Sequence, residues 1–464
     1  MKVTKFEKIE RFRDFSLTKI RNNHSVCTFS FASAKFDGFS DLIGNNVEVS
    51  DGNNTLMYAY VSDVAFVLGN TENLVEVTLV SRSKNVDLDT STRVFQKENQ
   101  TYKDILNEVI QKMNYELNVP VSLSEAKLEH PIVQTDETDF IFVKRLVQEA
   151  YGREIVVDAE NDNKIFVGYI DSSKYAIKQN EIFTISQKMS MEDKTIEFTI
   201  KGDSEGQELR EFVNIGKQIS WQGDTFVINR IEIVKTEDVY RYKCYAIGDR
   251  LLDGKAENKC ATFVAKVIDV DDPENLGRVR LDFSNDDIED MSPEGKMWCN
   301  VLTPYTAKSG GFVFIPDVDD IVETIWNGSE FIIIGCIRQE QLAERYQDVK
   351  LKQIGNIHEK NVCFSEENIE ITSKEVILTI FDEETHITIG NSDISILKDK
   401  IDIRTKKSAI EISDDIVADT CILHVDSDEL EHKVKKSYTC ESKNINLNAS
   451  GSAVIEGKTK VSIN

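Results

Sequence analysis

Short segments in which apolar and polar residues alternate fill the last hundred residues of the chain, and they constrain its fold more than any other feature. Each segment holds two aliphatic residues two positions apart, and both lie on one face of a strand because side chains alternate between the faces. Successive pairs follow at steps of roughly seven to nine residues, too short and regular for a β-sandwich. The pairs are Ile387 and Ile389, Ile394 and Ile396, Ile401 and Ile403, and Ile410 and Ile412.

A narrow ladder of such strands cannot bury its apolar face by itself. Winding several copies about a common axis would turn every apolar face inward and leave no free strand edge. We therefore expect residues 366–464 to form an intertwined β-needle, with these eight isoleucines as its core.

The composition narrows the classes of function. The chain has 464 residues, enough for several domains, and 40% of them are hydrophobic. Its 55 Lys and Arg against 81 Asp and Glu give a net charge of -26, which argues against nucleic-acid binding. The first residues lack the apolar run of a signal peptide, and no stretch of about 18 apolar residues could span a bilayer. We expect synthesis and retention in a cytosol.

The order of strand and helix patterns predicts a mainly β fold in six parts. We expect a small β-barrel over residues 1–90, an α/β insert over 91–172 and a second β-barrel over 173–255. A small closed barrel of the OB type follows over 256–340, and a polar linker over 341–365 precedes the needle. In the insert, one helix begins with Thr101 and Asp104 in a capping-box arrangement, and a second, from about residue 138 to 150, ends at Gly152.

Three stretches in the predicted OB region resemble motifs of a known family. Residues 272–280 are similar to D-P-x-x-x-G-R-V-[KR], residues 298–305 to W-x-x-V-x-x-P/x-[YS], and residues 310–322 to G-x-x-F-[IL]-P-E-V-G-D-E-V. Asp317 and Asp319 depart from the usual Glu and Gly, but Asp keeps the charge at the first position and tolerates a turn at the second. The matching positions are Asp272, Pro273, Gly277, Arg278, Trp298, Pro304, Gly311, Pro316 and Asp320.

These motifs are those of the spike proteins of contractile injection machines. The family includes VgrG of type VI secretion and the hub-and-spike proteins of contractile phage tails, R-type bacteriocins and extracellular injection systems. A fourth stretch, residues 134–146, resembles the Q-x-x-E-[ST]-D-x-x-F-[LI]-x-R-L helix of the family's hub through Gln134, Asp139 and Arg145. The resemblance thus covers hub, OB barrel and needle in the family's order.

The resemblance implies a homotrimeric central spike, with a tandem β-barrel hub, an OB barrel and a C-terminal trimeric β-helix or β-prism. Two hub barrels in each of three chains would adapt a six-fold tube to a three-fold needle that pierces the target mechanically. The implied partners are an inner-tube or tube-initiator protein and baseplate proteins, within an assembled injection particle. A PAAR-type tip protein would contact Ser462, Ile463 and Asn464. The target membrane would be touched only during injection.

The motif residues are explained better by backbone geometry than by chemistry. Pro273 fixes φ and Gly277 allows a left-handed turn, so this segment can reverse the chain tightly between two strands. Pro316 ends one strand, and Asp317 to Asp320 turn the chain into the next. We expect no catalytic residue, metal or cofactor, and no enzyme activity.

Several alternative chemistries remain as hypotheses. Paired carboxylates for glycoside cleavage could be Glu137 and Asp139, Glu383 and Glu384, or Asp414 and Asp415. Inward-facing copies of His386, His424 or His432 could hold a metal on the needle axis, although we expect these side chains to face solvent. The eight cysteines show no C-x-x-C spacing, so buried reduced thiols are expected.

The alternative function is that of a trimeric β-fibre, either an adhesin or a glycan-cleaving tailspike. Such fibres usually present a binding or catalytic domain beyond the prism, whereas this sequence stops within the predicted prism, which favours the spike. Neither the type of contractile machine nor the loading of effectors follows from these patterns.

Overall fold

The computed structural model describes residues 1–413, apart from short gaps at 35–37, 53, 113, 121–125, 162–163, 191–192, 237–238, 249–259, 308–309, 339–346, 349, 357 and 407–408, and also describes 450, 451 and 454. It divides the chain into two compact units, Met1–Gln339 and Glu340–Asn464. The expectation of a mainly β protein is confirmed. Among the described residues, no helix combines the length and apolar character needed to cross a membrane.

The hub is built on one continuous sheet of twelve strands. Its edge-to-edge path is β1 (Lys2–Val3), β4 (Asn46–Asp51), β5 (Asn54–Val67), β6 (Leu74–Ser81), β3 (Val26–Ala32), β2 (Phe15–Ile20), β16 (Asp224–Thr236), β17 (Val239–Gly248), β14 (Lys194–Ile200) and β13 (Ile182–Met189), with β15 (Gln218–Trp221) and β12 (Lys174–Ala176) joined through β16. Alternation forms these strands as expected: in β6, Val75, Val77 and Leu79 are buried and the residues between them are not.

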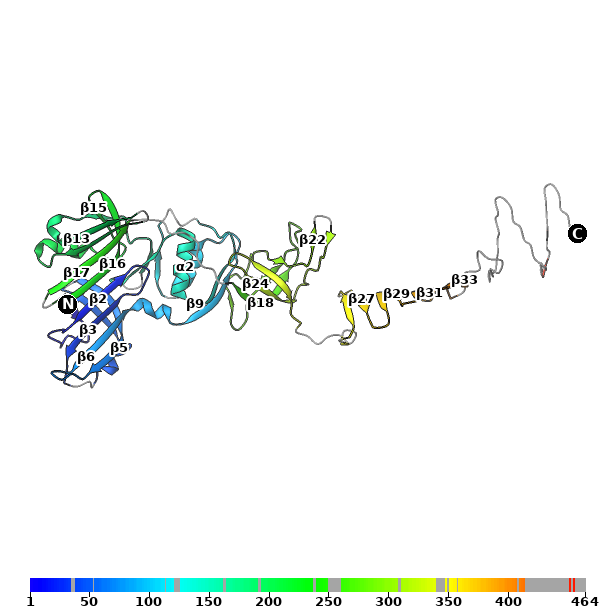
Figure 1. Ribbon diagram of the computed structural model, residues 1–464, viewed down its shortest axis with the longest axis horizontal. Coiled ribbons are helices and arrows are strands. Elements are labelled where there is room, and N and C mark those ends of the chain that lie inside the picture. The colour runs from blue at the N-terminus through cyan, green and yellow to red at the C-terminus, as the bar shows by residue number, and fades with distance from the viewer. Residues whose placement is uncertain are drawn as a thin grey trace. The chain divides into compact units, whose positions relative to one another are not determined.

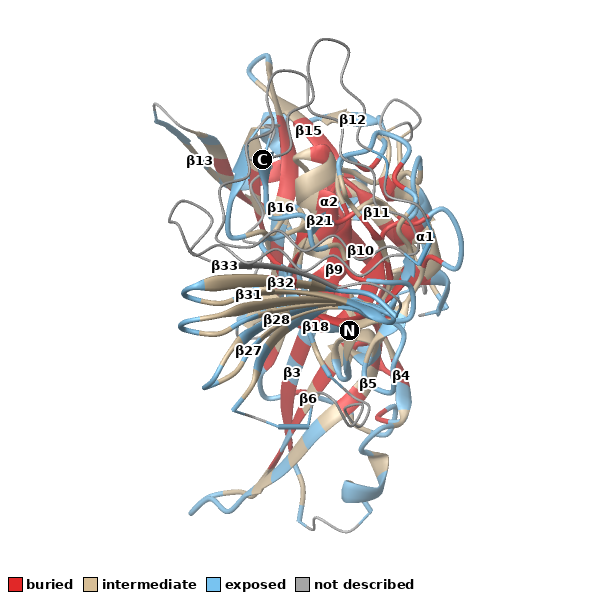
Figure 2. Ribbon diagram, turned by 90° about the vertical axis from the view of Figure 1, so that its right-hand side faces the viewer, coloured by how far each residue is buried: buried red, intermediate tan, exposed pale blue. Residues whose placement is uncertain are grey.

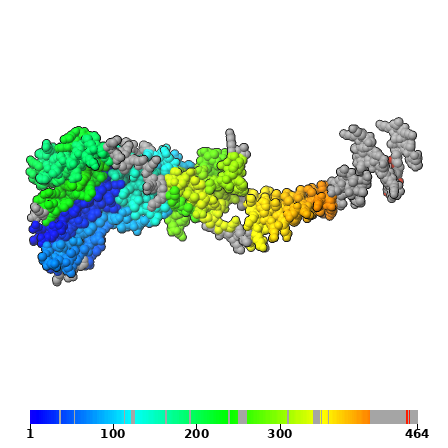
Figure 3. All heavy atoms as spheres, viewed as in Figure 1, coloured from blue at the N-terminus to red at the C-terminus, as the bar shows by residue number. Residues whose placement is uncertain are grey.

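The two halves of the hub share one sheet, whereas a β-barrel was expected in each half. Strand β2 pairs antiparallel with β16, with Ser16 opposite Val234 and Ile20 opposite Arg230. Segments more than 200 residues apart in the sequence therefore lie side by side, as the blue and green strands of Figure 1 and the adjoining blue and green atoms of Figure 3 show. Each half is an open half-barrel, because its edge strand pairs with the other half instead of closing on itself.

The α/β insert packs two helices against short strands. Its elements are β7 (Thr90–Phe95), α1 (Tyr102–Lys112), β8 (Glu116–Asn118), β9 (Ile132–Thr138), α2 (Asp139–Tyr151), β10 (Ile155–Asp158) and β11 (Lys164–Val167). The Thr101 and Asp104 side chains each accept a hydrogen bond from the other residue's backbone N–H, which forms the predicted capping box. Thr138 Oγ1 accepts from the N–H of Ile141, and α2 ends at Gly152. A short helix, α3 (Gln207–Phe212), covers the second half of the hub.

The OB region is a five-stranded sheet in the order β19 (Arg280–Asp282), β18 (Ala261–Asp269), β24 (Ile321–Trp326), β25 (Phe331–Cys336) and β21 (Asn300–Val301). Phe263, Phe283 and Phe331 fill its core. The hairpin β22 (Thr306–Ala307) and β23 (Gly310–Gly311) projects from it. Strand β20 (Glu289–Asp290) leaves this sheet and pairs with β7 of the insert. The OB region and the hub therefore share a small sheet, β20-β7-β9.

The second unit is a ladder in which each strand pairs antiparallel with the next. Its strands are β26 (Lys352–Gly355), β27 (Lys360–Phe364), β28 (Ile369–Ser373), β29 (Val376–Ile380), β30 (Thr385–Ile389), β31 (Ser392–Ile396), β32 (Lys400–Arg404) and β33 (Ala409–Ser413). The expected linker over 341–365 already contains β26 and β27, so the ladder begins earlier than predicted. These strands were not recognised because their aliphatic residues, such as Ile354 and Val362, are isolated among polar ones.

Candidate functional site

Two residues of the hub motif meet around Arg93 of β7. The Arg93 guanidinium donates to the carboxylate of Asp139 at the start of α2, and to Gln134 Oε1 of β9 at 3.0 Å. Gln134 in turn donates from Nε2 to Asp139 Oδ1 at 2.9 Å. Gln134 is fully buried and Arg93 is 9% exposed. A buried charge must be paired and hydrogen-bonded, and this network satisfies all three groups.

The third hub-motif residue, Arg145, binds two residues of β9, the strand that leads into α2. It lies on α2 and donates to the Val133 carbonyl at 2.6 Å and to the Glu137 carboxylate. Glu137 and Asp139, which the sequence presents as a possible acid pair, are thus each bound to a different arginine. The hub motif therefore fixes the turn from β9 into α2, and both carboxylates have structural partners.

Arg93 also reaches the OB region. Its Nε donates to Glu289 Oε2 at 3.1 Å, and Glu289 lies opposite Arg93 in the parallel pairing of β20 with β7. Lys112 of α1 holds the same carboxylate at 2.8 Å. The hub–OB junction is therefore made of both backbone pairing and ion pairs.

A second buried network closes this junction beside the first. Lys296, 5% exposed, donates to Asp290 Oδ2 at 2.7 Å and to Asp282 Oδ1 at 2.9 Å. Gln96 of the insert donates from Nε2 to the same Asp290 at 2.9 Å, and its backbone N–H donates to Ser292 Oγ. Burial opposes ionisation of Asp282, but the Lys296 ammonium outweighs it and lowers the pKa of that carboxyl. Sequence reasoning missed these residues because nothing local connects Gln96 with positions nearly 200 residues later.

The OB motif residues gather at the turn that precedes β19. The Asp272 carboxylate accepts from the N–H groups of Glu274 and Leu276 and from the Arg278 guanidinium at 2.7 and 3.0 Å. The guanidinium holds the pKa of Asp272 well below its usual range. Gly277 has a φ of +73°, as the turn prediction requires. Trp298 lies beneath both Arg278 and Arg280, whose guanidinium carbons are 6.0 and 4.4 Å from its ring centre.

The remaining OB motif residues shape loops. Asp320 Oδ2 accepts from the N–H of Asp317 at 2.9 Å, and Asp319 adopts the left-handed conformation that Gly would favour, with φ +77°. Pro316 is buried at the foot of the projecting hairpin, and Pro304 is exposed on it. Among the described residues, no three His, Cys, Asp or Glu side chains lie where they could hold a metal together.

The ladder of the second unit has one apolar face and one polar face. A row on the apolar face runs from Ile371 through Leu378, Ile387 and Ile394 to Ile403, each residue pairing directly with the next. The parallel row contains Ile396 and Ile401. The backbone of β33 continues the pairing, with Ile410 opposite Ile403 and Ile412 opposite Ile401. Ile389 lies on the same face opposite Val376. Six of the eight isoleucines expected in the needle core are therefore in register on one face, and the side chains of Ile410 and Ile412 lie outside the described ones.

Within the described residues, that apolar face is left uncovered. Large apolar side chains of the ladder that are 36–54% exposed all lie on it: Ile354, Phe364, Ile369, Ile371, Val376, Ile380, Ile389 and Ile396. Figure 2 shows the difference, with buried strands in the hub and intermediate or exposed ladder strands. His386 lies on the polar face, where its Nδ1 is 2.9 Å from Ser395 Oγ. His424, His432, Asp414, Asp415 and the expected tip contact Ser462, Ile463 and Asn464 lie outside the described residues.

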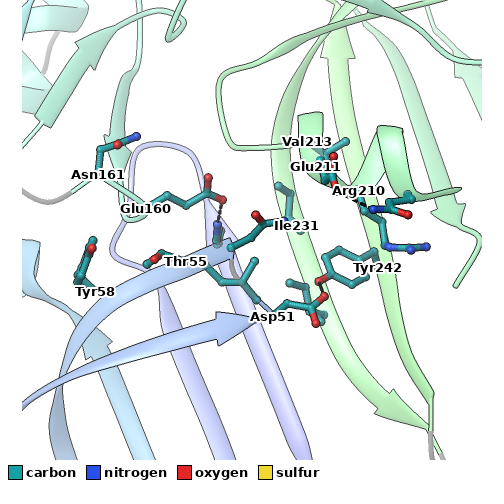
Figure 4. Close-up of a pocket in the computed structure, with 15 residues that line it drawn as sticks. Asp51, Thr55, Tyr58, Glu160, Asn161, Arg210, Glu211, Val213, Ile231 and Tyr242 are labelled. Carbon is teal, nitrogen blue, oxygen red and sulfur yellow. Dashed lines mark hydrogen bonds and ion pairs between the residues drawn. The ribbon is translucent and has the colours of Figure 1, made fainter. Parts of the chain in front are cut away.

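A cavity of about 550 Å³ lies between the two halves of the hub (Figure 4). Lys19, 2% exposed, pairs there with Glu160, whose pKa is raised by burial. Tyr242 donates its hydroxyl proton to Asp51 at 2.6 Å. These four side chains are thus paired within the protein, and Thr55, which also lines the cavity, donates its hydroxyl to Glu48 Oε1 at 2.6 Å.

Comparison with known proteins places these features in two families. Residues 14–165 match the family described as the phage tail baseplate hub (GPD). Residues 263–331 match the type VI secretion system/phage-baseplate injector OB domain. The chain therefore contains, in this order, a stretch that matches a baseplate hub and a stretch that matches an injector OB domain. These matches agree with the resemblance that the motifs predicted.

Solved structures show the same fold at low sequence identity. An E. coli component of the type VI secretion system, described as structurally similar to the T4 bacteriophage tail proteins gp27 and gp5, is 15% identical with a TM-score of 0.50. That alignment covers 73% of this chain and all of the other. The VgrG-containing lidless PdpA–VgrG complex is 8% identical with a TM-score of 0.51, over 90% of this chain and 94% of that one. The lidded form of that complex, from Francisella, is 10% identical with a TM-score of 0.49, over 90% and 76%. No curated protein matches the chain by sequence.

Proposed function

We propose that this protein is the central spike of a contractile injection machine and that it acts as a homotrimer. The observation that carries the proposal is the uncovered apolar face of the ladder, which follows an injector OB domain in the chain. A contiguous apolar face of this kind marks an interaction surface. Three copies wound about one axis would cover one another's faces as a β-prism needle.

The energetics favour such an assembly. Full burial of an Ile or Val side chain stabilises by about 1.5–3 kcal/mol. The eight exposed apolar side chains of the ladder still have about two-fifths of their surface to bury. Covering them would contribute on the order of 5–10 kcal/mol for each copy, within the range of the association penalty that a stable complex must overcome.

The hub supports the proposed change of symmetry. Its sheet consists of two half-barrels joined at β2 and β16, so a trimer would present six similar lobes to a six-fold tube. We propose an inner-tube or tube-initiator protein and baseplate proteins as partners of this surface, and a PAAR-type tip protein at the far end of the needle. The needle would pierce mechanically, with no catalytic step, and the carboxylates of Glu137 and Asp139 serve the fold through their arginine partners.

Sedimentation of the full chain tests this proposal. We expect a trimer for the natural sequence. Ile394→Asp and Ile403→Asp should each destabilise the assembled needle, because each places three like charges near the axis. Thr372→Asp is the matched control, since this residue lies on the polar face of β28 next to Ile371. It should leave the trimer intact.

Two results would count against the proposal. A monomeric full chain would refute the spike assembly itself. Normal trimers from both isoleucine variants would show that the apolar face does not point to the axis, even if the chain trimerises by other means.

A further inference from the structure

A hairpin on the OB region carries a dense group of exposed apolar side chains. We call residues 302–307 and 310–318, which contain β22 and β23, the OB hairpin. Six of its large apolar side chains are 48–79% exposed: Leu302, Tyr305, Phe312, Val313, Phe314 and Val318. The ring centres of Phe312 and Phe314 lie 6.1 Å apart, so the two exposed rings are neighbours on the hairpin. Exposed apolar side chains do not contribute to the solubility of a chain, which here has a net charge of -26. A group of this size instead marks an interaction surface.

The base of the OB hairpin has a defined conformation. Thr303 Oγ1 lies 3.0 Å from the carbonyls of both Tyr305 and Phe312, and the Phe312 N–H donates to the Tyr305 carbonyl at 3.0 Å. Gly311 adopts a φ of +145°, and a Cβ there would lie 2.9 Å from the Tyr305 carbonyl oxygen. The backbone that carries the apolar side chains is thus ordered before any partner arrives, which lowers the backbone entropy lost on binding.

The same OB region exposes a second apolar surface, on the outer face of its sheet. We call it the sheet patch, and it consists of Val264 and Ile268 of β18, Ile325 of β24 and Ile334 of β25. These four side chains are 36–41% exposed. The three strands are neighbours in the sheet, and Val264 and Ile325 lie diagonally across the β18–β24 pair. Two charged residues of the same face lie among them: Glu323 is opposite Val264, and Lys266 separates Val264 from Ile268.

We propose that the OB hairpin of one copy packs onto the sheet patch of a neighbouring copy. Two different unpartnered apolar surfaces on one small domain are what a head-to-tail contact requires, and repetition of that contact about an axis closes a ring. A single foreign partner would cover one surface and leave the other in water. The inference rests on the trimer proposed above and names the contact that would lock its OB layer.

The area of the contact is too small to hold two copies together without the needle. A fully buried aromatic side chain covers roughly 150–250 Å², so the exposed halves of Tyr305, Phe312 and Phe314 together amount to roughly 300 Å². Stable interfaces bury about 800 Å² on each partner. The OB hairpin would therefore not hold copies together alone, but would close once the ladder had brought them close.

Photo-crosslinking tests the contact in the full chain. A benzoylphenylalanine residue replaces Phe314, trimers are assembled from isotopically light and heavy chains, and the cross-linked peptides are identified by mass spectrometry. We expect mixed light–heavy cross-links from position 314 to strands β18, β24 or β25. The same probe at Leu276, which is 65% exposed in the same domain, is the matched control and should give no such cross-link.

The outcomes separate this inference from the function on which it rests. A monomeric chain overturns both. A trimer can also form without the expected cross-links, because position 314 reacts only within its own chain, reacts with another segment, or does not react. Each of these results overturns the hairpin contact but not the trimer. A Val313→Asp trimer should persist but exchange the amide hydrogens of β18 at least several-fold faster, and unchanged exchange in this variant would contradict the proposal.

Discussion

Replacement of Arg93 by Met is the most direct test of how the hub motif works. The change keeps the length of the side chain but removes the cation that holds Asp139, whose side chain is only 18% exposed. Loss of one partner of a buried ion pair costs about 3–5 kcal/mol, because it strands the other charge. Asp139 keeps one hydrogen bond from Gln134, so we expect a value near the lower end, about 3 kcal/mol.

The partners of Arg93 differ in what they contribute. Glu289 is 53% exposed and its second partner Lys112 is 41% exposed, so the loss of these solvated ion pairs in Glu289→Gln should cost under about 1 kcal/mol. Asp139→Asn leaves Arg93 buried without its closest anion and should also destabilise. The double variant of Arg93→Met and Asp139→Asn removes both charges and should cost less than the sum of the two single variants, with a coupling of about 2 kcal/mol.

Amide hydrogen exchange in β9 and α2 is the appropriate assay, because a chain of several domains does not unfold in one step. The opening free energy of these segments should fall by about 3 kcal/mol in Arg93→Met. A decrease below about 1 kcal/mol, or additive single variants, would refute the view that a buried ion pair fixes this turn. Glu289→Gln serves as the control for the loss of an exposed charge at the same arginine.

Three further predictions concern single positions. Burial lowers the pKa of His24 from 6.5 to about 4. As the pH falls, His24 therefore binds a proton in the unfolded chain before it does so in the folded chain, and the free energy of unfolding decreases. Between pH 7.5 and pH 5 this decrease should be about 2 kcal/mol. His24→Gln should remove that part of the pH dependence in thermal unfolding, and an unchanged slope would contradict it. Thr138→Ala should weaken the start of α2 by about 1 kcal/mol in exchange measurements, whereas Thr138→Ser should not. Gly311→Ala should strain the OB hairpin by about 1–3 kcal/mol and speed its amide exchange, and equal exchange would show that the hairpin tolerates a Cβ.

Local signals made parts of this structure predictable. The second helix of the insert was found because Thr138 and Gly152 mark its ends, and the OB turn because Gly277 follows Pro273 at turn spacing. The alternation of the ladder identified its apolar face, since the period of two is set by strand geometry alone. The prediction for this turn named Pro273 and Gly277 as the residues that shape it. The structure adds Asp272, whose carboxylate accepts hydrogen bonds from Glu274, Leu276 and Arg278 and so organises the whole turn.

Long-range pairing could not be predicted from these patterns. Strand β20 holds only Glu289 and Asp290, which nothing in the sequence marks as a strand, yet it joins β7 almost 200 residues earlier. The pairing of β2 with β16 is equally hidden, because any two alternating strands could pair in this way. The expectations of a barrel in each half of the hub and of a linker without strands have the same origin. Strand patterns show which residues alternate between the faces, but they leave open which strand edges pair with each other.

The spacing of the ladder makes its length adjustable in discrete units. From Ile371 the step to Leu378 is seven residues and the next, to Ile387, is nine, and the same two steps lead through Ile394 to Ile403. One hairpin of sixteen residues therefore returns the chain to the same face and direction, and advances it by two strand spacings, roughly 9–10 Å. Insertion or removal of such a unit would change the reach of the ladder without moving any isoleucine off its row. Reach is thus a quantity that evolution or an engineer could alter by whole hairpins.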